Sequence, residues 1–190
     1  MEAQKVLDFW FGKPKDLNYR KPRKFWFVKN DEFDSQVKSQ FRHYYEQAAA
    51  GKLHHWQQQP LSCLALIIVL DQFPRNMFRG SPQAFATDEQ AKTHAKYAIA
   101  HQFALQLILV QRWFVYLPFE HSENLEDQET SIKLFDSLPA HPDSKSAIDY
   151  AYRHWKVIQR FGRFPHRNQI LGRTNTPEET EFLNQPGSGF

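Results

Sequence analysis

The sequence predicts an all-α protein, a compact array of seven to eight helices. Apolar residues recur at intervals of three and four along most of the chain, which is the period of an amphipathic helix, and strand-like alternation is scarce. Residues 61–72 and 103–117 are apolar on nearly every face, so they should be central helices that amphipathic neighbours cover. With 190 residues and no low-complexity linker, the chain is expected to form one domain over 1–190, with an irregular tail at 184–190.

The first part of the chain predicts two helices separated by a basic loop. Residues 3–11 are rich in apolar side chains and form the first helix, and residues 12–24, with their glycine and prolines, form the loop. Asn30 or Asp31 then caps an amphipathic helix, and Gly51 ends it.

Both central helices are expected to end at a Phe-Pro or Leu-Pro pair. Pro60 suits the first turn of the earlier helix, and Pro74 ends that helix because a residue before proline is pushed out of the α region. The later helix, 103–117, ends in the same way at Pro118.

The other helices are amphipathic and have recognisable starts. They are expected over 87–101, 123–138, 144–162 and a short stretch from 176. Thr87 and Gln90 form a capping box for the first of these, and Thr176 with Glu179 caps the last.

Nearly the same phrase occurs twice, as "LDQFPRNMFRG" at 70–80 and "RFGRFPHRNQILGR" at 160–173. In each, a helix runs into Phe-Pro, and Arg and Asn follow, so polar residues gather at a helix end near the interior. Arginine suits such a place, because its planar fork binds carboxylates and phosphates through several hydrogen bonds. The predicted ligand-binding residues are Asp71, Arg75, Asn76, Arg79, Arg163, His166, Arg167, Asn168 and Arg173.

An acidic segment, "YLPFEHSENLEDQE", follows the second central helix. It supplies the predicted catalytic residues: His121 as proton carrier, and Glu120 or Glu123 to set its tautomer and raise its pKa. If the three polar clusters line one pocket, that pocket suits a small anionic ligand, or hydrolysis or an acid–base step on a phosphate or carboxylate compound.

The same residues have a structural interpretation and a metal-binding one. The arginines could pair with the carboxylates and hold helix ends in register. Glu120, His121, Glu123 and His166 could ligate a metal, but their spacing matches no His-Glu-x-x-His motif and the arginines oppose a cation. No metal and no cofactor are therefore predicted.

The composition indicates where in the cell the protein is located and which classes of partner it does not have. A single cysteine, Cys63, fits a reducing compartment, and the N-terminus lacks the features of a signal peptide, so a cytoplasmic protein is expected. No apolar run is long enough to cross a bilayer, so no membrane association is predicted. The net charge of +3 is too small to indicate nucleic-acid binding.

Several phrases resemble one known family over essentially the whole chain. In order, they are "VLDFWFG", "LDQFPRNMFRG", "FATDEQA", "YLPFEHSE", "FGRFPHRN" followed by "LGR", and "TPEETEFLNQPGSGF". They are similar to the bacterial domain-of-unknown-function family numbered 924. The resemblance implies a tetratricopeptide-like all-helical fold, and it implies no activity, substrate or cofactor.

A helical array of this kind leaves a second function open. Helical repeats bind peptides in concave grooves, where arginines can clamp a partner's carboxylate. A peptide-binding module without enzymatic activity, with a purely structural Arg/Glu cluster, is therefore the alternative. An open groove lined by exposed Trp26, Tyr44 and Trp56 would favour it.

Overall fold

The computed structural model describes residues 2–189, which form eight α-helices linked by turns and short 3-10 helices, with no strand among them. The predicted all-α class is confirmed. Met1 and Phe190, the two ends of the predicted domain, lie outside the described residues. The helices are α1 (Glu2–Phe11), η1 (Lys24–Trp26), α2 (Asp31–Ala49), η2 (His54–Gln58), α3 (Pro60–Met77), η3 (Pro82–Phe85), α4 (Asp88–Ala100), η4 (Phe103–Gln106), α5 (Leu109–Glu120), α6 (Leu125–Asp136), α7 (Ser144–Phe161), η5 (Pro165–Arg167) and α8 (Pro177–Leu183).

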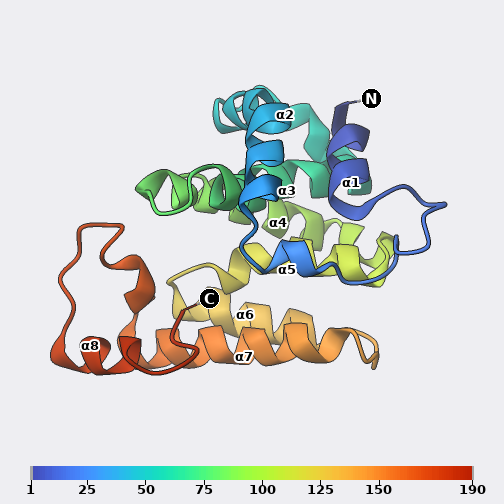
Figure 1. Ribbon diagram of the computed structural model, residues 1–190. Coiled ribbons are helices and arrows are strands. Elements are labelled where there is room, and N and C mark those ends of the chain that lie inside the picture. The colour runs from blue at the N-terminus through green and yellow to red at the C-terminus, as the bar shows by residue number, and fades with distance from the viewer. Residues whose placement is uncertain (1, 190) are drawn as a thin grey trace.

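The helices form two groups joined through α5 (Figure 1). In the upper group α3 packs against α1, α2, α4 and α5. In the lower group α6 and α7 lie side by side, and α8 lies at one end of α7. Because α5 contacts α3 and α4 on one side and α6 and α7 on the other, it connects the two groups.

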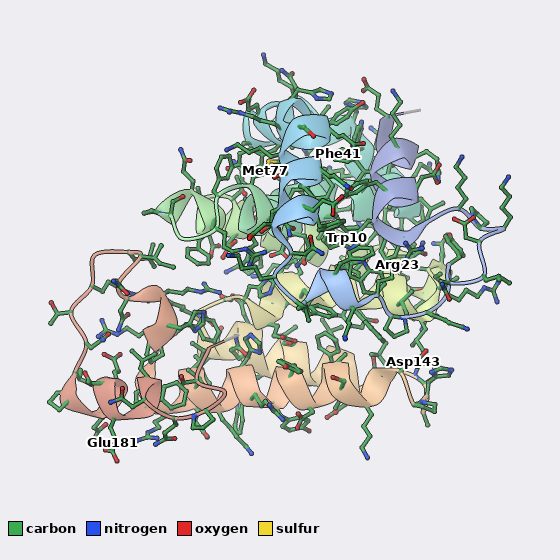
Figure 2. The ribbon with its side chains drawn as sticks, viewed as in Figure 1. Trp10, Arg23, Phe41, Met77, Asp143 and Glu181 are labelled. Carbon is green, nitrogen blue, oxygen red and sulfur yellow. The ribbon has the colours of Figure 1, made fainter. Side chains whose placement is uncertain are left out.

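Large aromatic rings fill the interior around α3. Every residue from Cys63 to Pro74 is buried, as the apolar run predicts. Phe73 lies 5.7 Å from Trp10 and 4.9 Å from Phe41, measured between ring centroids. Figure 2 shows Trp10 and Phe41 in the upper group, beside α1 and α2. Burying rings of this size contributes strongly to stability, since each removes a large apolar area from water.

The prediction that proline ends both central helices is wrong. Helix α3 continues through Pro74 to Met77, and α5 continues through Pro118 to Glu120. Pro74 has no N–H, so it cannot bond to the carbonyl four residues earlier. The Thr87 hydroxyl fills that role by donating to the Leu70 carbonyl oxygen at 2.6 Å. The predicted capping box at Thr87 is therefore wrong as well, because its side chain caps nothing in α4.

The extra helical turns place several polar residues of the repeated phrase inside helices. Arg75 and Asn76 of the first phrase belong to the last turn of α3, and Glu120 of the acidic segment is the last residue of α5. Their side chains consequently project from regular helix into the space between the two groups of helices.

Most other boundaries agree with the expected ones. Asn30 caps α2 by accepting from the Phe33 N–H, and Thr176 forms the predicted capping box with Glu179. The expected helix 103–117 is divided, because Ile108 adopts an extended conformation between η4 and α5. No helix among residues 2–189 combines the length and the apolar character needed to cross a membrane. The tetratricopeptide-like arrangement stays a prediction.

Candidate functional site

A cavity of about 770 Å³ lies between the two groups of helices. Its walls come from η1 and the residues around it, the C-terminal ends of α3 and α5, one face of α7, and η5. Figure 2 shows one lining residue, Asp143, where α7 begins, at the opposite end of α7 from Glu181 in α8.

Only some of the predicted site residues line this cavity. Those that do are Arg75, Asn76, Arg79, Glu120, His121, His166 and Arg167. Those that do not are Asp71, Glu123, Arg163, Asn168 and Arg173. All three clusters contribute to the lining, and the second phrase does so only through its central part.

Asp71 and His121 form a hydrogen-bonded pair at the cavity wall. Asp71 is fully buried, and its Oδ1 lies 2.7 Å from His121 Nδ1. Its Oδ2 accepts from Gln72 Nε2 at 2.6 Å. Asp71 therefore orients the His121 ring, a role that the sequence had suggested for Glu120 or Glu123.

The charges around this pair shift the pKa values of both of its members. Burial raises the pKa of Asp71, but His121 and Arg75 outweigh that effect and lower it to about 2. Burial, followed by the nearby Arg75 guanidinium, lowers the pKa of His121. At neutral pH an ionised Asp71 thus accepts from the Nδ1–H of a neutral imidazole. His121 Nε2 is then the ring nitrogen that can take a proton.

Asp88, a residue that sequence reasoning missed, holds two of the arginines. Arg75 donates to both Asp88 oxygens, at 2.7 and 2.9 Å, and to the Asp71 carbonyl oxygen at 2.6 Å. Arg167 Nη1 lies farther away, 3.6 Å from Asp88 Oδ2. Asp88 is the first residue of α4. A carboxylate at this position interacts favourably with the helix dipole, so its place in the sequence indicates only that a helix begins there.

Arg167 differs from the other arginines at the cavity. Its guanidinium carbon lies 4.6 Å from the Phe85 ring centroid and 4.5 Å from that of Phe164. Within residues 2–189 its side chain donates no hydrogen bond, and its enclosed Nε has no partner. Burial, and then repulsion from Arg75, lowers its pKa to about 10, so it stays charged at neutral pH. It is a buried cation whose hydrogen-bond donors are unused.

Glu120 and His154 form a second buried pair in the wall. Glu120 Oε1 lies 3.1 Å from His154 Nδ1, which also bonds the Tyr150 carbonyl at 2.8 Å. Burial raises the pKa of Glu120 well above its usual value, Asp71 adds to this, and burial lowers that of His154. Both shifts favour the neutral form of the side chain. His154 was not predicted, although its spacing from Ala151 and Ile158 puts it on the buried face of α7.

The rest of the second phrase forms an ion network away from the cavity. Arg173 donates to both oxygens of Glu123 at 2.7 and 2.9 Å and to Asn168 Oδ1 at 2.8 Å. Arg163 donates to both oxygens of Glu179 at 2.6 and 2.7 Å. These contacts tie the segment after α7 to α8 and to the loop after α5. They match the structural interpretation of these residues.

Two residues of the first phrase also have a carboxylate partner. Asn76 Nδ2 donates to Asp34 Oδ1 at 2.7 Å, and Arg79 donates to both Asp34 oxygens at 2.9 and 3.1 Å. Arg79 and Asn76 therefore join α3 to α2 while they line the cavity.

Two further observations concern the metal-binding and peptide-binding interpretations. No group of three or more His, Cys, Asp or Glu among residues 2–189 could hold a metal ion. Trp26, Tyr44 and Trp56, the aromatics expected in an open groove, are all buried in the core.

The fold and the site together define an all-α protein with a cavity between its two groups of helices, at whose wall lie an Asp–His pair and an arginine that donates no side-chain hydrogen bond within residues 2–189. Residues 6–187 match the family described as "Bacterial protein of unknown function (DUF924)", and the chain belongs to this family. The resemblance seen in its phrases is confirmed. The chain is also similar to a solved structure, the protein of unknown function ATU0120 from Agrobacterium tumefaciens, with 37% identity, a TM-score of 0.85, and coverage of 96% of this chain and 97% of that one. No curated protein matches it.

Proposed function

We propose that the cavity binds a small anionic ligand and that Arg167 is its principal anion donor. The observation that carries this proposal is the unused hydrogen-bonding capacity of a guanidinium that lies against two phenyl rings in the cavity wall. Asp88, at 3.6 Å, offsets part of the charge of Arg167 but accepts no hydrogen bond from it, and a buried donor without an acceptor is costly. A carboxylate or phosphate group would satisfy the fork through two parallel hydrogen bonds.

The Asp71–His121 pair favours one further function at this site, an acid–base step on the bound ligand. Asp71 holds the ring through Nδ1, so Nε2 can accept a proton from the ligand or from a water beside it. The proton would then reside on the imidazolium, which Asp71 stabilises, until it returns to the product. The geometry supports this role for His121 and gives none to Glu123, which Arg173 binds on both oxygens.

The proposal is tested by a thermal-shift and calorimetry panel of inorganic phosphate, sugar phosphates, monocarboxylates and dicarboxylates. A ligand at a hundred times its dissociation constant adds about 2.7 kcal/mol to stability, which raises the melting temperature by about 5–10 °C in a chain of this length. We expect one class to produce this rise. Arg167→Met should abolish it, and Arg153→Met on the exposed face of α7 should retain it.

The ligand-free variants separate a ligand-binding role from a structural one. Met fills the space between the two rings but carries no charge, so Arg167→Met should not lower the melting temperature of the free protein. A clear drop, with no response of the parent protein to any anion, would show that Arg167 is structural. A peptide captured in a pull-down under those conditions would support the peptide-binding alternative. A peptide partner and a cytoplasmic location stay predictions.

A further inference from the structure

The cavity that holds Arg167 also has an extensive apolar wall. Trp113 and Leu117 of α5 lie one helical turn apart and face it, and Trp26, Phe135 and Ala147 add to the same lining. These residues come from four different elements, so the apolar wall is a built surface of the cavity and not the side of one helix.

The apolar wall extends away from the polar end. Trp113 lies in α5 and His121 directly follows that helix, eight residues later, which corresponds to about 12 Å at the rise of a helix. A volume of about 770 Å³ falls within the range of cavities that enclose small organic molecules. An inorganic ion bound at Arg167 would leave most of this space unfilled.

The charges at the polar end select a ligand with a single negative group. Arg75 is already paired with Asp88 on both oxygens, and Arg79 with Asp34 on both oxygens. Arg167 is thus the one lining arginine among the described residues whose side chain makes no hydrogen bond. A polyphosphate would need several free cations, whereas a monocarboxylate needs one fork.

We infer that the ligand is an amphipathic organic acid, with a carboxylate on Arg167 beside His121 and an apolar body along Trp113, Leu117 and Phe135. This inference rests on the proposed function, because it names the class of anion that the same site takes. Carbon chains and aromatic rings fit the apolar wall, since such surface gains free energy by leaving water.

The test is calorimetric titration of the full chain with straight-chain monocarboxylates from acetate to decanoate, with inorganic phosphate alongside. Each methylene buried against the wall should tighten binding about fourfold, up to the chain length that fills the cavity. Ala147→Phe puts a ring into the apolar part, so it should shorten the best-bound chain and leave acetate unaffected. Ala140→Phe, on an exposed residue of the loop before α7, should leave the series unchanged.

The outcomes separate this inference from the function on which it rests. Affinity that does not vary with chain length would overturn the inference. If acetate or phosphate still bound in that case, and Arg167→Met abolished the binding, the anion site would stand. Binding that tightens with chain length but ignores both Arg167→Met and Ala147→Phe would place the acids elsewhere and overturn the inference. An absence of binding by every acid and by phosphate would overturn both proposals.

Discussion

His121 Nδ1 donates to Asp71 Oδ1 at 2.7 Å, although 50 residues separate them in the chain. Asp71 belongs to α3 and His121 directly follows α5, so the bond joins the C-terminal ends of the two central helices. The pair also fixes which ring nitrogen stays free of Asp71, namely Nε2. This relationship is the basis of the first prediction.

Asp71→Asn should lower the pKa of His121 further, and the neutral ring should no longer be restricted to the tautomer with its proton on Nδ1. The negative charge of Asp71 acts to raise that pKa, and the amide that replaces it is neutral and can present either oxygen or nitrogen. The measurement is a pH titration of imidazole nitrogen shifts by NMR, with Asp136→Asn on α6 as the surface control. A parent protein whose His121 carries its proton on Nε2 would contradict the assignment.

Thr87→Val should lower the free energy of unfolding by about 1–3 kcal/mol, because the buried Leu70 carbonyl loses its donor. Pro74→Ala supplies a backbone N–H that can bond the same carbonyl. The double variant should therefore be destabilised less than the sum of the single changes, which denaturant unfolding of all four proteins measures. Thr93→Val, on an exposed part of α4, is the control and should cost little. Strict additivity would exclude the proposed role of Thr87.

Glu123→Gln and Arg173→Met should each destabilise the protein by about 2 kcal/mol, since each leaves a half-buried charged partner without its bidentate pair. The coupling energy of the double-mutant cycle should be about 1–2 kcal/mol. The anion response of the cavity should persist in all three variants, because neither residue lines it. Loss of that response in a folded variant would assign this pair to the binding site.

The pH dependence of stability should change in His166→Gln. Burial, and then Arg167, lowers the pKa of His166 to about 4 from a usual value of 6.5. Between pH 6.5 and 4 the unfolded chain gains a proton there that the folded protein does not, so this residue makes stability fall as the pH falls, by about 1.4 kcal/mol per pH unit.

Other buried groups titrate in the same region, so the comparison is between variants. The depressed pKa of buried His154 acts in the same direction, and the raised pKa of buried Glu120 acts in the opposite one. Denaturant unfolding from pH 4 to 7 should therefore show that the free energy of unfolding falls less steeply with falling pH in His166→Gln than in the parent. His141→Gln, on an exposed side chain, should leave the profile unchanged. Equal slopes in all three proteins would mean that His166 titrates normally.

Local chemistry accounts for what could be predicted at the site. The sequence correctly placed four residues at the cavity: Arg75, Glu120, His121 and Arg167. Each follows an apolar, helix-like segment, and polar side chains in that position are expected to lie near the interior. Asp88 and His154 escaped notice, because a carboxylate at a helix start and a histidine on a helical face each have a simpler local explanation. Their role depends on which side chains lie opposite, and this depends on how the helices pack.

The amino-acid sequence by itself determined the all-α class, the two central helices and most of the helix starts. These follow from hydrophobic periodicity and capping, which act over a few residues. Only the tertiary structure decided that helices continue through Pro74 and Pro118. At Pro74, Thr87, distant in the chain, supplies the donor that the proline lacks. The tertiary structure also decided which arginines have a structural role. A guanidinium that packing brings against a carboxylate is bound by it, whereas one without such a contact keeps hydrogen-bond donors that a ligand could use. Arg173 meets Glu123, whereas Arg167 meets two phenyl rings and an open cavity.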